Sequence, residues 1–273
     1  MPYLRPVPGN TSSYHKFDLS DESAFAFIGV LAVMLVIFLV LTRNCNRENT
    51  LMTENAIFNE ETTPEASIIN HQSTINNWLE SFHLVNINDI DNSILVDLKY
   101  ATADNFTGMV LYDGLHCAYL QPDVALMLAE AHRYLKTLHP GLRLLVYDAV
   151  RPLSVQRTMW ERVKDTKYHR YVAHPERFSL HNYGAAVDLT LADSLGQPLD
   201  MGTPFDHFGR AAGISDEPAL VNQGLLTGQQ VQNRQLLRQV MRQAGFRSVS
   251  GEWWHFNACS LQEAKQRYML VDF

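Results

Sequence analysis

The sequence predicts an α+β fold, in which helices and short strands do not alternate as regular βαβ units. Three stretches lead to this prediction: residues 121–138 carry apolar side chains at helical spacing, residues 143–147 (RLLVY) form a short apolar run, and residues 185–191 (AAVDLTL) favour a strand. With 273 residues, of which 46% are hydrophobic, the chain can bury one sizeable core and still carry further segments.

The N-terminal part divides by composition into three segments. Residues 1–23 form a short polar tail with several turn-forming residues. Residues 24–42 include 18 consecutive residues without a charge, and a helix of that length spans roughly 27 Å, close to a bilayer's hydrocarbon thickness. We therefore expect a transmembrane helix there, since a cleaved signal peptide or lipidation at Cys45 fits less well. Residues 43–75 read as a polar tether to a folded domain at 76–273.

Composition also narrows the class of partner. The net charge of −7 argues against nucleic acid, which a basic stripe would favour. The three cysteines, Cys45, Cys117 and Cys259, show no CxxC spacing, and we expect unpaired thiols.

Within the domain the elements follow in order. Residues 94–100 (ILVDLKY) alternate apolar and polar side chains as a strand does. Pro122 suits the first turn of the 121–138 helix, and the strand at 143–147 leads through a DAVRP sequence into a helix at about 153–164. Thr227 can cap a long helix over 229–244, which Gly245 ends.

Two stretches carry the chemistry, SLHNYGAAVD at 179–188 and EWWH at 252–255. His181, Asp188 and His255 make a three-ligand set for one Zn²⁺ ion, with the fourth position open to water. That is the pattern of a catalytic zinc site, because structural sites close all four positions. Glu252 is then the carboxylate beside the metal that can act as a general base.

Strand geometry constrains how these residues meet. Residues seven apart on one strand face opposite sides, so His181 and Asp188 cannot share an uninterrupted strand and bind one metal. Gly184 and its neighbours offer the break, with His181 on a loop and Asp188 on the strand. The same parity problem applies to Glu252 and His255, and we expect a bulge or bend at Gly251 to solve it.

At these residues the chain resembles the zinc D-alanyl-D-alanine peptidases, through Ser179-x-His181-x-x-Gly184-x-Ala186-x-Asp188 and Glu252-x-x-His255. Asp148-x-x-Arg151-Pro152 and the MGTPFD stretch at 201–206 are similar to the D-alanyl-D-alanine dipeptidases of the VanX type. The resemblance covers roughly residues 85–270 and leaves out the apolar segment and the tether.

The resemblance implies a mechanism and roles for further residues. Arg151 would stabilise the oxyanion of the scissile carbonyl, and Asp148 would orient its guanidinium. Ser179 and Trp253 would line the substrate pocket, whereas Trp254 is expected to remain a core residue. The expected substrate is the free D-Ala-D-Ala dipeptide, with Glu252 and the Ser179 segment meeting its ammonium group and residues 201–206 walling off that end.

Two other functions stay open at this point. One is a D,D-carboxypeptidase acting on peptidoglycan stem peptides, and the other is a non-catalytic wall-binding module. Glu252 and Arg151 favour an enzyme, because binding alone needs neither a base nor an oxyanion partner. Since Arg and Lys residues balance on the two sides of residues 24–42, charge does not set the orientation of the anchor. The substrate class leads us to expect the zinc domain in the periplasm.

Overall fold

The computed structural model describes residues 77–272. The predicted tail at 1–23, membrane segment at 24–42 and tether at 43–75 lie outside these residues. In the described part of the chain, no helix combines the length and apolar character needed to cross a membrane.

Helices and strands are mixed along the chain, which confirms the predicted α+β class. The strands are β1 (Val85–Asn86), β2 (Leu95–Val96), β3 (Tyr119–Leu120), β4 (Arg143–Asp148), β5 (Ala186–Ala192), β6 (Arg247–Ser248) and β7 (His255–Asn257). The α-helices are α3 (Ile87–Ile90), α4 (Pro122–Leu138), α5 (Leu153–Val163), α6 (Glu217–Asn222), α7 (Gly228–Gln243) and α8 (Leu261–Arg267). Short 3₁₀ helices are η2 (Lys99–Ala101), η3 (His169–Tyr171), η4 (Leu180–Tyr183) and η5 (Arg210–Ala212).

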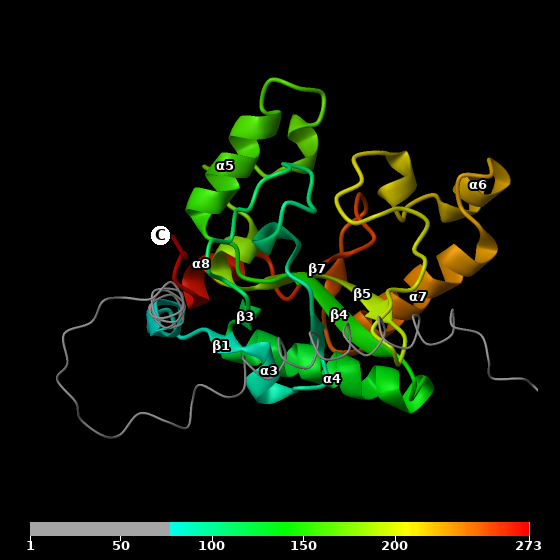
Figure 1. The fold of residues 1–273 in the computed structure, drawn as a ribbon, viewed down its shortest axis with the longest axis horizontal. Coiled ribbons are helices and arrows are strands. Elements are labelled where there is room, and N and C mark those ends of the chain that lie inside the picture. The colour runs from blue at the N-terminus through cyan, green and yellow to red at the C-terminus, as the bar shows by residue number, and fades with distance from the viewer. Residues whose placement is uncertain (1–76, 273) are drawn as a thin grey trace, which may run out of the picture. The chain divides into compact units, whose positions relative to one another are not determined.

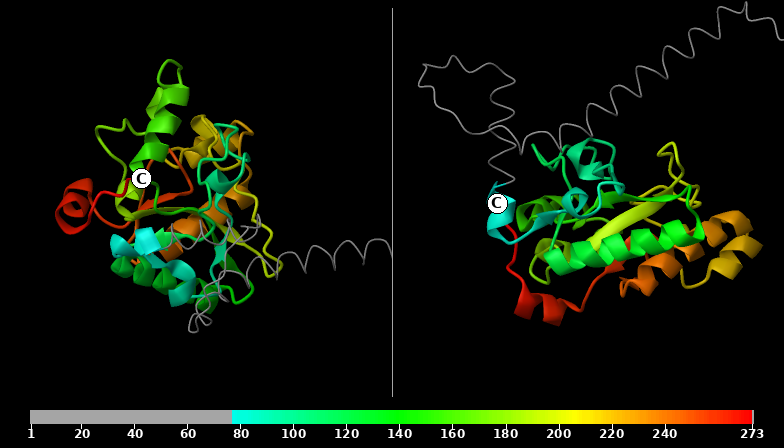
Figure 2. Two further views of the ribbon diagram at one scale, coloured as in Figure 1. Left: turned by 60° about the vertical axis from the view of Figure 1, so that its left-hand side comes forward. Right: turned by 90° about the horizontal axis from the view of Figure 1, so that it is seen from below.

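A five-stranded sheet in the order β2-β4-β5-β7-β6 forms the centre of the domain (Figure 1). Strand β2 runs parallel to β4, and the other neighbouring strands are antiparallel. Helices α4 and α7 lie side by side across one face of the sheet, and α5 lies on the other side with several long connecting segments (Figures 1 and 2). The strand β5 is buried along its whole length, as expected for the middle of a sheet covered on both faces.

The predicted helices are confirmed, and their ends follow local chemistry. Pro122 occupies the first turn of α4, whose buried face includes Val124, Leu128 and Leu135. Thr227 caps α7 and forms a reciprocal capping box with Gln230, which satisfies backbone N–H groups that the first turn leaves unpaired.

The predicted strand at 94–100 is shorter than its alternating pattern suggests. Only Leu95–Val96 pair with β4, and the chain then tightens into η2. This turn takes Tyr100 out of the strand and buries its ring beside the candidate site described below. The alternating sequence pattern did not predict this turn, because the aromatic side chain of Tyr100 also fits a strand.

A small apolar cluster packs around η4, the 3₁₀ helix that directly precedes β5. It contains Leu180, Tyr183, Ala185, Ala186, Cys259 and Ala264. Cys259 is buried and free, as predicted, whereas the same prediction is wrong for Cys117, which is disulfide-bonded.

Candidate active site

Three neighbouring strands bring polar side chains into one row. The register pairs Asp188 on β5 with Asp148 on β4 and with His255 on β7, so the three side chains share one face of the sheet. A β-bulge between Val146 and Asp148 makes this possible, because residues two apart on a regular strand would face the same side. The bulge turns Asp148 toward the row while Val146 keeps its place opposite Leu189.

His181 reaches the same row from η4, as the parity argument predicted. Ser179 caps η4, and Gly184 ends it in a left-handed conformation with φ of 62°. A Cβ atom at Gly184 would lie 2.6 Å from Cδ2 of Leu84, so the chain has room only for glycine there. The tight turn delivers His181 to the site immediately before β5 begins.

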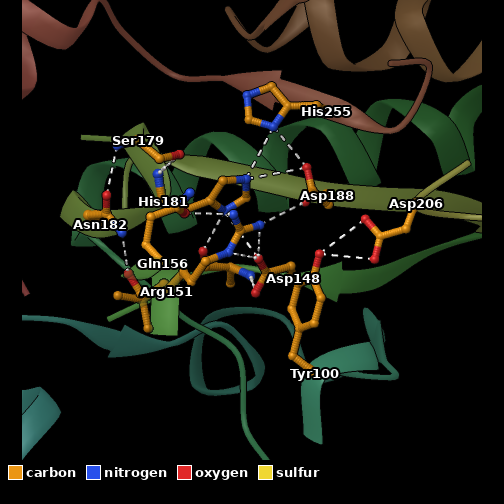
Figure 3. Close-up of polar contacts among 12 residues, drawn as sticks. Tyr100, Asp148, Arg151, Gln156, Ser179, His181, Asn182, Asp188, Asp206 and His255 are labelled. Atoms are coloured by element: carbon orange, nitrogen blue, oxygen red, sulfur yellow. Dashed lines mark hydrogen bonds and ion pairs between the residues drawn. The ribbon is translucent and has the colours of Figure 1, made fainter. Parts of the chain in front are cut away.

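His181, Asp188 and His255 form a compact donor set (Figure 3). One ligand atom from each lies within 4.8 Å of the others. Nε2 of His181 is 3.1 Å from Nδ1 of His255, and Oδ1 of Asp188 is 3.3 and 2.9 Å from these two nitrogens. Two nitrogens and an anionic oxygen that converge this closely fit one divalent cation with nitrogen and oxygen ligands.

In each imidazole, the outer ring nitrogen, which does not belong to the donor set, also has a hydrogen-bond partner. Nδ1 of His181 lies 2.7 Å from the carbonyl oxygen of Ala149, and Nε2 of His255 lies 2.8 Å from Oδ1 of Asn257. Both acceptors require the proton on the outer nitrogen, which leaves the inner nitrogen free to bind a metal. Asn257 was missed from the sequence, where a lone asparagine on a strand carries no recognisable signal.

Arg151 and Asp148 form a buried pair beside the donor set. Asp148 accepts hydrogen bonds from Nε and Nη2 of Arg151 at 2.9 and 2.5 Å. Although burial opposes the charge, Asp148 keeps the pKa of Arg151 well above its usual value, so the guanidinium is cationic. Nη1 donates to Oε1 of Gln156 at 3.0 Å, and Nη2 approaches Oδ2 of Asp188 at 3.5 Å. These contacts fix the direction of the Arg151 guanidinium. Asp148 was expected to orient it, and Gln156 is a second partner.

Glu252 lines the same cavity but does not lie on a strand. The strand β7 begins only at His255, and Glu252 stands on the bend before it, so the parity problem does not arise. Of the bulge or bend expected at Gly251, the structure has the bend, whereas the register shift of this sheet lies in β4. Burial, with a smaller contribution from the negative charge of Asp188, raises the pKa of Glu252. A raised pKa makes this carboxylate a stronger base, which suits a proton acceptor.

These groups surround a cavity of about 630 Å³, within the range of small-molecule sites. The profile of one protein family, Peptidase M15, described as D-ala-D-ala dipeptidase, matches residues 80–272.

The chain belongs to this family. A D-alanyl-D-alanine dipeptidase of Escherichia coli (strain K12) is 35% identical over 196 residues, which cover 71% of this chain and 92% of that protein. Proteins of the same name from Synechocystis and from Enterococcus faecalis are each 32% identical, covering 54% and 59% of this chain and 71% and 83% of their own lengths.

Two predicted pocket residues of this dipeptidase-family chain differ in position. Ser179 lines the cavity, and its hydroxyl also accepts a hydrogen bond from the backbone N–H of His181. Trp254 is buried, as expected, and it also lines the cavity, whereas Trp253, which was expected there, does not line it. Trp253 is buried on the other side, where its indole donates to the hydroxyl of Thr203 at 2.8 Å.

Asp206 is a site residue whose part the sequence did not specify. It lies in the cavity wall, and the phenol of Tyr100 hydrogen-bonds both its carboxylate oxygens at 3.1 and 3.0 Å (Figure 3). Its backbone is left-handed, with φ of 60°, a conformation that a non-glycine residue adopts only when its surroundings impose it. Burial above all, and then the charge of Asp188, raise the pKa of Asp206 to about 8. The 201–206 motif did point to this loop, but not to the carboxylate as its functional group.

Proposed function

We propose that this chain is a zinc-dependent peptidase that hydrolyses the D-Ala-D-Ala dipeptide to two molecules of D-alanine. The observation that carries the proposal is the convergence of His181, Asp188 and His255 within 4.8 Å, in one cavity with Arg151 and Glu252. Membership of the dipeptidase family and the names of the relatives give the substrate. A non-catalytic binding module would need neither the buried guanidinium nor the spare carboxylate.

The donor set favours zinc over other common metals. Two imidazoles and one carboxylate suit Zn²⁺ in a catalytic site, whereas Mg²⁺ and Ca²⁺ prefer oxygen ligands alone. A zinc ion held by these three residues would supply Lewis-acid chemistry, lowering the pKa of a water to about 7 and polarising the peptide carbonyl.

The remaining chemistry comes from the protein's own residues. Glu252 accepts a proton from the attacking water and delivers it to the leaving amine, a role that its raised pKa supports. Arg151 presents its guanidinium to the carbonyl oxygen as negative charge develops there. Because Asp148 and Gln156 fix that fork in advance, little reorganisation is needed during the reaction.

Asp206 supplies the recognition of a free dipeptide. A dipeptide carries an ammonium group next to the scissile bond, and Asp206 offers an anionic partner inside the cavity. The pKa of about 8 belongs to the cavity without substrate, where Asp188 adds negative charge to the effect of burial. An ammonium placed beside Asp206 opposes both effects and keeps the carboxylate charged. This role replaces the expectation that Glu252 and the Ser179 segment meet the ammonium.

The test compares two substrates that differ only at that amine. The purified full chain should cleave free D-Ala-D-Ala at least about 10³-fold better in kcat/KM than its N-acetyl form, because acetylation leaves the buried carboxylate of Asp206 without a cationic partner. Removal of zinc by a chelator should abolish both activities, and added zinc should restore them. Comparable rates on the two substrates would instead favour the D,D-carboxypeptidase alternative.

A further inference from the structure

The loop that carries Asp206 is held by a single buried side chain outside the cavity. Arg234 on α7 is 0% exposed and is the largest fully buried side chain of the described residues. It donates from Nε to the carbonyl oxygen of Met201 at 2.6 Å, and from Nη2 and Nη1 to those of Ala211 and Gly213 at 2.9 and 3.4 Å. We call residues 200–213 the amine loop. One guanidinium thus fixes both ends of this loop, with Asp206 between them.

Other side chains of α7 attach the beginning of the same loop. Gln230 donates to the carboxylate of Asp200, and Asn233 donates to its carbonyl oxygen, each at 2.8 Å. Residues three and four apart on a helix share one face, so Gln230, Asn233 and Arg234 present a continuous polar strip to the loop. Gly202, with φ of 84°, allows the close approach, because a Cβ atom there would lie 2.3 Å from Cδ2 of Leu226.

Arg234 also contacts the segment that carries Glu252. Its guanidinium lies over the ring of Trp253, 5.9 Å from the ring centroid. The indole of Trp253 in turn donates to Thr203 inside the amine loop. Arg234 therefore contacts both Trp253, which follows Glu252 in the chain, and the amine loop that carries Asp206.

Burying a cation costs free energy, and the hydrogen-bond partners of Arg234 indicate why one is buried here. Removing a guanidinium from water is unfavourable unless its donors are paired. Glu217 lies 3.9 Å from Nη1 of Arg234 and is itself held bidentately by Arg238. The hydrogen bonds of Arg234 go to the carbonyl oxygens of the amine loop. An apolar residue would fill the same space without this cost, but it could not hold the loop backbone.

We propose that Arg234 is a positioning residue for substrate selection, which acts by holding the amine loop so that Asp206 meets the ammonium group of the dipeptide. The inference rests on the proposed function. The left-handed backbone at Asp206 needs the surrounding loop to impose it, and Arg234 closes that loop at both ends. Loss of the hydrogen bonds from Arg234 to the amine loop therefore moves Asp206 and leaves the candidate metal ligands in place.

The test uses Arg234→Lys and Arg234→Met, with Arg238→Met as the matched control one turn further along α7. Lysine keeps the charge but cannot reach three carbonyls at once. Because a small misplacement in a site can cost about 10²-fold, we expect kcat/KM for D-Ala-D-Ala to fall by about that factor in both Arg234 variants, mainly through KM. Their preference for the free over the N-acetyl dipeptide should fall at least about tenfold, and zinc content should stay at the wild-type level. Arg238→Met loses only contacts with Glu217 and should lower Tm while KM and the preference stay unchanged.

Hydrogen exchange gives a readout that is independent of catalysis. The amides of residues 201–213 should lose protection in the Arg234 variants and keep it in Arg238→Met, even where Arg234→Met is poorly active. Wild-type KM and substrate preference in a folded Arg234→Lys would overturn the proposal and leave Arg234 as a purely structural residue. A wild-type enzyme that does not prefer the free dipeptide would instead contradict the proposed function, whatever the exchange result.

Discussion

At the scale of single residues, the two imidazoles of the candidate metal site differ in what holds them. A backbone carbonyl fixes His181, whereas the side chain of Asn257 fixes His255. Asn257→Ala should therefore weaken zinc binding by about 10–100-fold, the usual effect of removing such a partner. Asn257→Asp keeps an acceptor and should bind zinc at least as well as the wild type. Competition with a chromophoric chelator measures both, and equal affinity in Asn257→Ala would remove this residue from the site.

The residues proposed to bind the metal and to catalyse separate by zinc content. Alanine at His181, Asp188 or His255 should remove most bound zinc, since two protein ligands remain. Glu252→Ala should keep the metal and lose about 10²–10⁴ in rate, the contribution of positioned acid–base catalysis. Metal analysis and turnover on the same samples make the distinction. Normal turnover in Glu252→Ala would contradict the mechanism.

The guanidinium at position 151 is expected to act through its geometry. Arg151→Ala should cost about 10²–10³ in kcat, like the loss of an oxyanion donor. Arg151→Lys should recover little, because an ammonium cannot bond Asp148 through two nitrogens and also reach Gln156. Steady-state kinetics on D-Ala-D-Ala measures both variants, and a lysine variant near wild type would show that charge alone suffices.

Metal-free protein should become less stable as pH rises. Burial lowers the pKa of His255, but the hydrogen bond and charge of Asp188 outweigh it and raise the pKa to about 9. In the unfolded chain histidine titrates near 6.5. The folded state therefore holds the extra proton between these values, and its contribution to stability, about 1–3 kcal/mol, is present at pH 6 and lost as the pH rises through about 9. Urea unfolding of chelator-treated protein measures it. The His255→Ala protein should lack this part of the slope, and identical slopes in both proteins would refute the assignment.

At the scale of elements, the turn between η4 and β5 determines where His181 points. Gly184→Ala places a Cβ atom against Leu84 at a left-handed position, so we expect a loss of about 1–3 kcal/mol in unfolding free energy and weaker zinc binding. Gly141→Ala is the control, because a Cβ atom there meets nothing within 4 Å. Urea unfolding compares them, and a Gly184 variant as stable as the control would contradict this view of the turn.

The elements were predicted well where periodicity or capping decides the structure. Helices α4 and α7 agree with their predictions within a residue or two, since apolar spacing and Thr227 mark them. The end of β2 and the bend before β7 could not be predicted, because tertiary contacts override strand-favouring residues there. The same holds for single residues: the ligands appear in a recognisable spacing, whereas Asn257, Gln156 and Arg234 gain their roles only from neighbours far along the chain.

At the scale of the whole molecule, the folded domain follows the N-terminal segments that the sequence predicts at 1–75. We propose that residues 24–42 anchor the chain and that the zinc domain faces the periplasm, where wall peptides are released. A periplasm-dependent reporter fused after Phe273 should then be active. The same fusion lacking residues 24–42 is the control and should be silent. A silent full-length fusion that is well expressed would place the domain on the other side.

The row formed by Asp148, Asp188 and His255 has a consequence for the timing of activity during biosynthesis. Asp188 and His255 are 67 residues apart, and His181 and His255 are 74 apart. The ribosome therefore releases the third candidate ligand well after the first two. A nascent chain holds an incomplete candidate site until β7 joins β5 in the sheet, so we expect no activity before that strand has been made.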